Sequence, residues 1–200
     1  MRLGLLGPAD GDLARLARAA RFLLEVRGID RAIYLGSDRA LDEVVEGWAR
    51  ELVGGDPSDD AVWDRAAACC GSGDPEAIRA FLEAEHARRR LARFEVLPSA
   101  GSRTVELLDG KVVVLIHDKA HLDEEDIVAA SLLAFGKSPE LLLKQVGPRW
   151  FLSPGVGGSL ILEDQDDGIH LTAYGRRQEL VKELPLDLSR GTRLRVQGAD

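Results

Sequence analysis

The most constraining feature of the chain is a unit that recurs in its first half. A short apolar run is followed by a loop rich in glycine or acidic residues, and then by a helical pattern. Residues 2–6 (RLGLL) precede apolar residues at helical spacing over 12–27, and residues 32–35 (AIYL) precede a second helical pattern over 40–52. Short buried strands that alternate with helices are typical of parallel βα units.

A third unit is expected after the polar loop at 54–60. Residues 66–70 (AAACC) are small and apolar, so we interpret them as a third strand that ends at the loop 71–74. Pro75 suits the first position of a helix, and a helix is therefore expected over 75–92.

The second half of the chain is rich in β-like segments. The sequence predicts strands over 93–97, 104–108, 111–116, 141–146, 149–152, 159–163, 169–174 and 177–183. Asp109-Gly110 is a hairpin signal, and a helix is expected over 123–134, where acidic residues fill the first turn. We therefore expect a mixed α/β (α+β) fold with two sheets flanked by helices. It should form one domain over residues 1–200, with the tail after about 188 unassigned.

Net charge, hydropathy and cysteine usage narrow the possible partners and the cellular compartment. The net charge is −8 and the pI is about 5.1, which disfavours nucleic acid and anionic membrane surfaces as partners. No apolar run approaches the roughly 18 residues that span a bilayer. The two cysteines, Cys69 and Cys70, are adjacent and complete no zinc pattern, so they are expected to be reduced. These observations favour a cytoplasmic protein without membrane insertion.

Six loops carry degenerate motifs in a fixed order along the chain. They lie at Pro8–Asp12, Gly36–Asp38, Gly71–Asp74, His117-Asp118, Gly136–Pro139 and Ser153–Val156. Their order and their strand or helix flanks resemble the calcineurin-like metallophosphoesterase family, in its compact bacterial phosphodiesterase type, from Met1 to about Leu184. The resemblance implies a four-layer αββα sandwich, metallophosphoesterase-like, in which these loops converge on one edge.

The resemblance also indicates which positions would form the metal centre. That family uses two metal ions to bind phosphate and to activate a bridging hydroxide. The vestigial positions implied here are Asp10, Ser37, Asp38, Ser72, Asp74, His117 and Lys137. Pro8 and Ser37 replace carboxylate ligands, and only Asp10 and His117 keep a strong donor. We therefore expect no catalytic residue, no metal and no cofactor at this site.

Lys137 is the expected substitute for the lost metal charge. It stands where the family has a histidine, and its ammonium group is expected to face one or more of Asp10, Asp74 and Asp118. A single ion gathered by the remaining carboxylates and His117 is left open.

The pattern of losses favours a catalytically inactive protein that acts as a protein-interaction or regulatory scaffold. The family includes a precedent, since the small retromer scaffold subunit resembles this fold and acts through protein contacts. Trp48, Trp63, Trp150 and Phe151 are candidates for a partner surface, or else pack in the interior. Two alternatives stay open: a weak or rearranged metal-dependent phosphoesterase, and a sensor of a small anion near Lys137.

Overall fold

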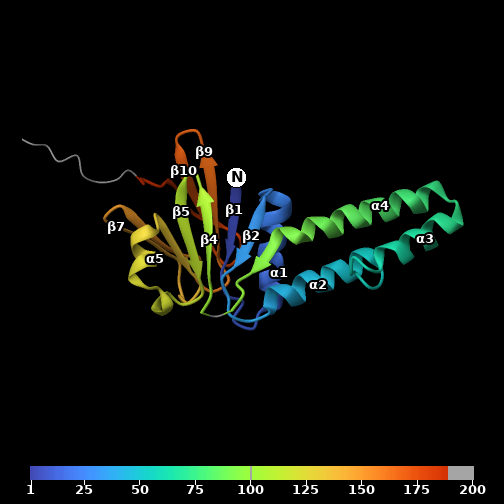
Figure 1. Cartoon of the computed structure of the whole chain (residues 1–200), viewed down its shortest axis with the longest axis horizontal. Coiled ribbons are helices and arrows are strands. Elements are labelled where there is room, and N and C mark those ends of the chain that lie inside the picture. Colours follow the sequence, from blue (N-terminus) through green and yellow to red (C-terminus); the bar gives the residue numbers. More distant parts are fainter. Residues whose placement is uncertain (100, 189–200) are drawn as a thin grey trace, which may run out of the picture.

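A computed structural model describes residues 1–99 and 101–188 of the chain, so the tail after 188 lies outside the described residues. Two sheets pack face to face (Figure 1). The strands of the first sheet are β1 (Arg2–Leu6), β2 (Arg31–Tyr34), β3 (Phe94–Val96), β9 (Ser159–Gln165), β10 (Gly168–Tyr174) and β11 (Leu180–Pro185). Their order is β11-β10-β9-β1-β2-β3. β1, β2 and β3 are parallel, and β9, β10 and β11 form the predicted antiparallel meander.

The second sheet is also mixed. Its strands are β4 (Arg103–Leu108), β5 (Lys111–Ile116), β6 (Leu132–Phe135), β7 (Leu142–Val146) and β8 (Arg149–Ser153), in the order β4-β5-β6-β8-β7. β4 and β5 form the hairpin that Asp109-Gly110 predicts, and both turn residues have positive φ, 49° and 64°. β5, β6 and β8 run parallel, so their carboxyl ends meet at one edge.

Helices cover the outer faces of both sheets and complete four layers. On the first sheet lie α1 (Leu13–Arg21) and a π-helical turn (Phe22–Val26), and Asp12 caps α1 by accepting a 2.8 Å hydrogen bond from the Arg15 amide. On the second sheet lies the short α5 (Glu124–Ala129). The expected mixed α/β fold with an αββα order of layers is confirmed. None of the helices in the described ranges is long and apolar enough to cross a bilayer.

The main core lies between the two sheets. Side chains that alternate along the strands meet there, including Leu3, Leu5, Ile33, Leu115, Leu132, Leu152, Leu160 and Leu171, all with 1% exposure or less. A second core lies under α1, where Leu16, Ala20 and Leu23 pack on the outer face of the first sheet. At the margin between the sheets, Arg31 on β2 donates to Glu95 on β3 and to Glu106 on β4, with N···O distances of 2.7 to 2.8 Å.

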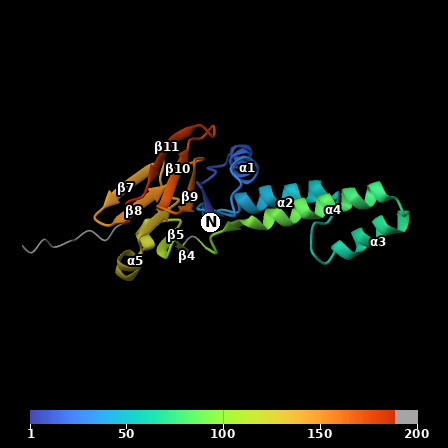
Figure 2. The same cartoon turned by 90° about the horizontal axis from the view of Figure 1, so that it is seen from above.

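A helical arm extends away from the sandwich (Figures 1 and 2). It consists of α2 (Ala40–Val53), α3 (Val62–Ser72) and α4 (Pro75–Arg90), with a 3₁₀ turn (Leu91–Arg93) that leads into β3. α2 and α3 run outward from the sandwich, and α4 returns along both of them. The helices predicted over 40–52 and 75–92 are confirmed.

The predicted strand over 66–70 is wrong, because these residues lie inside α3. A short run of small apolar residues cannot by its periodicity be told from part of a helix. Alanine has the highest helix propensity, and α4 supplies an antiparallel helix for the segment to pack on. The loop 71–74 therefore joins two helices and does not follow a strand.

The predicted helix over 123–134 is too long. α5 ends at Ala129, and Leu132–Phe135 forms β6 in the centre of the second sheet. All four residues of β6 are buried, and a central parallel strand reads in sequence as a continuous apolar run that resembles a buried helix face. β11 starts at Leu180, three residues later than predicted, because residues 175–179 form a turn closed by the Gly175 amide and the Glu179 carbonyl.

Candidate functional site

The loops that follow β1, β2, β5, β6 and β8 meet at one edge of the sandwich. We call it the strand-end edge, formed by residues 7–12, 35–38, 117–118, 136–139 and 153–158. His117 Nδ1 lies 2.8 Å from the Leu35 carbonyl oxygen, and the Lys137 amide donates to the His117 carbonyl at 2.7 Å. The Gly157 amide donates to the Pro8 carbonyl at 2.9 Å. Five of the six predicted loops therefore converge as expected.

Backbone packs directly on backbone at the strand-end edge. A Cβ atom at Gly136 would lie 1.9 Å from the carbonyl oxygen of Leu35, the residue that follows β2 of the other sheet. A Cβ at Gly7 would lie 1.9 Å from the carbonyl oxygen of Gly155. Real Cβ atoms do not approach other atoms so closely, so glycine is required at both positions. The loops are held in one arrangement by these contacts.

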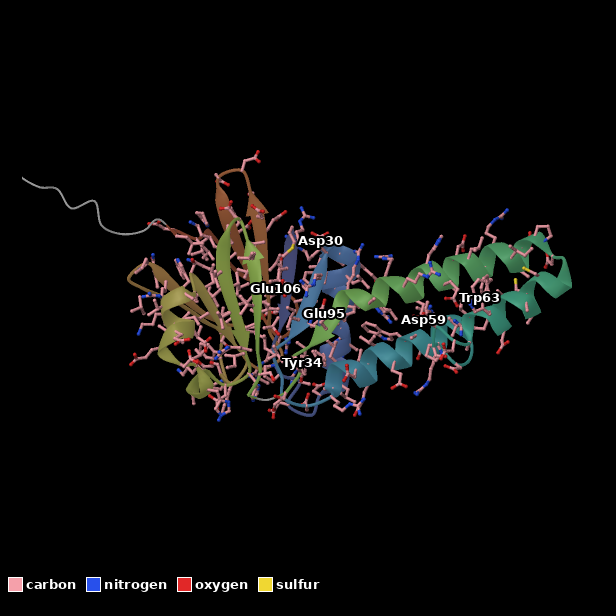
Figure 3. The ribbon with its side chains drawn as sticks, in the orientation of Figure 1. Asp30, Tyr34, Asp59, Trp63, Glu95 and Glu106 are labelled. Carbon is pink, nitrogen blue, oxygen red and sulfur yellow. The ribbon has the colours of Figure 1, made fainter. Side chains whose placement is uncertain are left out.

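Tyr34 lies at the end of β2 (Figure 3), and its hydroxyl joins the first two loops. Its hydroxyl accepts a 2.9 Å hydrogen bond from the Ala9 amide and donates a 2.7 Å bond to Asp38 Oδ1. Burial, and then the bond to Asp38, raise the pKa of Tyr34, so the phenol remains protonated. The Asp38 carboxylate also accepts from the Ala40 amide at 3.2 Å, so it fixes the start of α2.

Sequence reasoning did not single out Tyr34. The available signal was a tyrosine at the carboxyl end of an apolar strand, directly before a loop that contains glycine. A buried phenol needs a partner, and the nearest candidates are the polar groups of the neighbouring loops. Gly36 is part of the same arrangement, since a Cβ there would lie 2.2 Å from Cζ of the Tyr34 ring.

Lys137 forms the ion pair that the sequence predicts. Its Nζ lies 2.5 Å from Asp118 Oδ2, and this bond, followed by the Ala120 amide, lowers the pKa of Asp118. The Lys137 side chain is 66% exposed, so the pair lies at the surface of the edge. Among the predicted partners, Asp118 is confirmed. Asp10 is exposed in the loop after β1, in the left-handed backbone region that aspartate tolerates, with φ 51°.

Two predicted site positions lie elsewhere. Ser72 ends α3, and Asp74 caps α4 at the outer tip of the arm by accepting from the Glu76 amide at 3.0 Å. The third parallel strand is β3, so the loop that takes the place of the third motif begins at Leu97-Pro98-Ser99. The inserted helices α3 and α4 separate this loop from the position that the motif order indicated.

The strand-end edge does not fit a two-metal centre. Pro8 and Pro139 offer no ligand, and Ser37 offers no charge. The carboxylates of Asp38 and Asp118 are engaged by Tyr34 and Lys137. Over residues 1–99 and 101–188, no group of three or more His, Cys, Asp or Glu side chains could hold a metal ion.

The candidate aromatic residues divide between interior and surface. Trp150 is in the core between the sheets, with 9% exposure. Trp48, on α2, packs edge-on against Phe94 at 6.2 Å between ring centroids, with the Arg21 guanidinium 5.1 Å from its own ring. Trp63, on α3, is 79% exposed. Among these candidates, Trp63 on the arm is therefore exposed enough to contact a partner.

Solved structures of other proteins have a similar fold. Vacuolar protein sorting 29 from Cryptosporidium parvum matches with a TM-score of 0.52 and 12% identity, over 92% of this chain and 97% of that one. A conserved protein from Streptococcus pneumoniae, described as a predicted phosphoesterase, matches with a TM-score of 0.50 and 14% identity, over 92% and 96%. The chain has the calcineurin-like metallophosphoesterase fold. No family model and no curated protein matches its sequence.

Within the metallophosphoesterase fold, the observed order of strand-end loops explains why degenerate motifs were enough to indicate the architecture. Each loop follows a strand whose carboxyl end points to the same edge. At 12% and 14% identity these matches establish the fold, and the chemistry of the edge has to be argued from the residues of this chain.

Proposed function

We propose that this chain is a single-domain, catalytically inactive metallophosphoesterase-like protein that acts in the cytoplasm as a protein-interaction or regulatory scaffold. The observation that carries the proposal is the use of the polar groups at the strand-end edge. Tyr34 binds Asp38, and Lys137 binds Asp118, so two of the carboxylates that could approach a cation already stabilise the loops.

The chemistry of phosphoester hydrolysis supports the inactive assignment. A metal-bound hydroxide must be generated and the developing charge on phosphorus must be neutralised. Two cations repel each other unless several anionic or imidazole ligands converge between and around them. Pro8, Ser37 and Pro139 provide none of these ligands. His117 keeps an imidazole, and one of its nitrogens is bonded to the Leu35 carbonyl.

The interaction role is supported by the helical arm. It projects from the sandwich and carries Trp63, and large exposed aromatic side chains are enriched where proteins bind one another. Vacuolar protein sorting 29, whose structure has a similar fold, shows by its name that the fold occurs in proteins of sorting systems. The net charge of −8 favours a protein partner over nucleic acid or a membrane surface.

Hydrolysis of bis-p-nitrophenyl phosphate, with and without manganese, tests the inactive assignment. We expect no turnover above background and no rise in melting temperature with manganese, because the residues described at the strand-end edge offer too few ligands to bind manganese in the folded state. The control is His117→Ala. Manganese-dependent turnover that is lost in this variant would instead establish the rearranged phosphoesterase.

Affinity capture with variants tests the interaction role. We expect a specific protein to be retained by the wild-type chain and lost with Trp63→Ala. The matched control is Leu180→Ala on β11, a large side chain that is 59% exposed on the sandwich, and it should retain the partner. Equal capture by both variants, or capture of nothing specific, contradicts an interaction through the arm.

A further inference from the structure

The outer part of the helical arm lacks a hydrophobic core of its own. We call residues 50–90 the distal arm. Among those whose burial the structure describes, Glu85 is the one buried residue. Helices of 11 and 16 residues gain little stability in water unless an apolar face is covered. A helical hairpin with no buried apolar side chain is therefore built to pack against something further.

An open groove runs along α4 on the arm. Its outer part has a volume of about 540 Å³, with apolar lining from Leu52, Val53, Ala68, Ala77, Phe81 and Ala84. A second hollow of about 250 Å³ near the sandwich shares Leu52 and continues to Trp48, Ala87 and Leu91. We call the two together the arm groove.

The alanines along the groove have the spacing of a helix-packing seam. Ala77, Ala80, Ala84 and Ala87 on α4 are separated by three, four and three residues, so they lie on one face of the helix. Small side chains let another helix approach closely. Two antiparallel helices that leave such a face open form half of a four-helix bundle.

The charges of the arm indicate which molecule supplies the second pair of helices in the four-helix bundle. The outbound limb (residues 42–64) is acidic, with Asp42, Glu43, Glu46, Glu51, Asp56, Asp59, Asp60 and Asp64 against Arg50. The return limb (residues 76–93) is basic, with Arg79, Arg88, Arg89, Arg90 and Arg93 against Glu76, Glu83 and Glu85. An occupant must therefore offer a basic limb to the first and an acidic limb to the second.

A second copy of the same arm satisfies both requirements at once. In a two-fold arrangement with antiparallel arms, each acidic limb faces the basic limb of the other copy. Glu51 and Arg90 border the groove near the sandwich, and Asp64 and Arg79 lie farther out on the limbs. Within the part of the chain that the structure describes, these four exposed side chains make no ion pair and are available to a partner.

We propose that two copies of this chain associate through their arm grooves to form a symmetric dimer with a four-helix bundle at its centre. This proposal goes beyond the scaffold function. The dimer proposal concerns surfaces distant from the strand-end edge. If the protein hydrolysed phosphoesters, the dimer proposal would still stand. If the chain were monomeric, the proposal that it is catalytically inactive would still stand.

Charge-swap variants of the full-length chain test the dimer. One variant is Arg79→Glu with Arg90→Glu, and the other is Glu51→Lys with Asp64→Lys. In sedimentation velocity we expect the wild-type chain to dimerise and each variant alone to lose at least about tenfold in affinity, because like charges then face each other. An equimolar mixture should recover a heterodimer, since each altered limb meets its opposite. Circular dichroism confirms that both variants are folded.

The control and the outcomes are specific to the arm. Asp164→Lys with Asp166→Lys makes the same change of charge as Glu51→Lys with Asp64→Lys, but on the β9–β10 hairpin, and should dimerise like the wild type. A wild-type chain that is monomeric up to about 100 µM overturns the proposal. So does a mixture of the two variants that remains monomeric, because the assignment of self-complementary limbs would then be wrong.

Discussion

In the sandwich, leucine and isoleucine side chains from both sheets are fully buried, whereas the distal arm buries a carboxylate. Leu5, Ile33 and Leu160 have 1% exposure or less, and Glu85 has 4%. Glu85 accepts from Arg65 at 2.6 Å and from Arg88 at 2.8 Å. The sandwich is thus stabilised by apolar burial, and the distal arm by a network of ion pairs.

The same network fixes the loop between α2 and α3. Arg88 donates to the Pro57 carbonyl at 2.9 Å and to Asp59 at 2.8 Å, and Arg65 donates to the Asp56 carbonyl. Breaking one ion pair would release the loop and α3 together, with no apolar core to hold them. The arm should therefore open locally, at a lower free energy than the sandwich needs to unfold.

The largest expected effect on the free energy of unfolding comes from a glycine-to-alanine substitution in the sandwich, and the same substitution in the arm should have the opposite effect. Gly136→Ala should destabilise the sandwich by about 3 kcal/mol or more, because its Cβ would lie 1.9 Å from the Leu35 carbonyl oxygen. Gly47→Ala in α2 meets nothing within 4 Å and should stabilise by about 0.5–1 kcal/mol, since alanine favours a helix. Urea denaturation measures both. A neutral Gly136→Ala would show that the two sheets need not approach so closely.

Removal of the buried charge should affect the arm alone. Glu85→Gln leaves Arg65 and Arg88 without their anion and should lower the local stability by about 3 kcal/mol. Hydrogen exchange should then accelerate in α3 and α4 while β1 and β9 stay protected. Glu83→Gln, on an exposed position of the same helix, is the matched control. Equal acceleration in the sandwich would mean that arm and sandwich unfold as one unit.

Acid should release the arm before the sandwich. Desolvation favours the neutral form of Glu85, but hydrogen bonds from Arg88 and Arg65 outweigh it and hold its pKa below the ordinary value of 4.5. A lowered folded-state pKa contributes stability that is complete above the unfolded pKa and is lost as pH falls through the folded one. The protection of α3 amides, taken as the intrinsic exchange rate at each pH divided by the observed rate, should therefore be constant at neutral pH and fall below the ordinary value of 4.5. In Glu85→Gln this pH dependence should disappear.

The smallest effect is expected at the strand-end edge. Lys137→Ala removes the ion pair with Asp118, but the lysine side chain is 66% exposed and water and salt screen the pair. The melting temperature should change little, and the small change should vanish at high salt. A large loss that persists at high salt would show that Lys137 has a structural role beyond the pair. Thermal denaturation at two salt concentrations measures this change in melting temperature.

Local patterns predicted most of the architecture. The βα units at β1 and β2, the β4–β5 hairpin and the terminal meander follow from strand runs and turn residues that act over a few positions. The site was predicted in part. His117 and Asp38 reach the strand-end edge because their loops follow correctly identified strands. Lys137 reaches it after β6, a strand that the sequence analysis had assigned to a helix. Ser72 and Asp74 do not, because their preceding segment is the helix α3.

From the amino-acid sequence we could infer the first alternating strands and helices, the loss of metal-ligand types at Pro8 and Ser37, and an ion pair between Lys137 and a nearby carboxylate. Each of these depends on the identity of single residues or on short periodicity. Packing in the folded chain makes residues 66–70 helical, makes Leu132–Phe135 a central strand, and brings Tyr34 to Asp38. Those outcomes depend on which surface each segment packs against, and that surface comes from residues distant in the sequence.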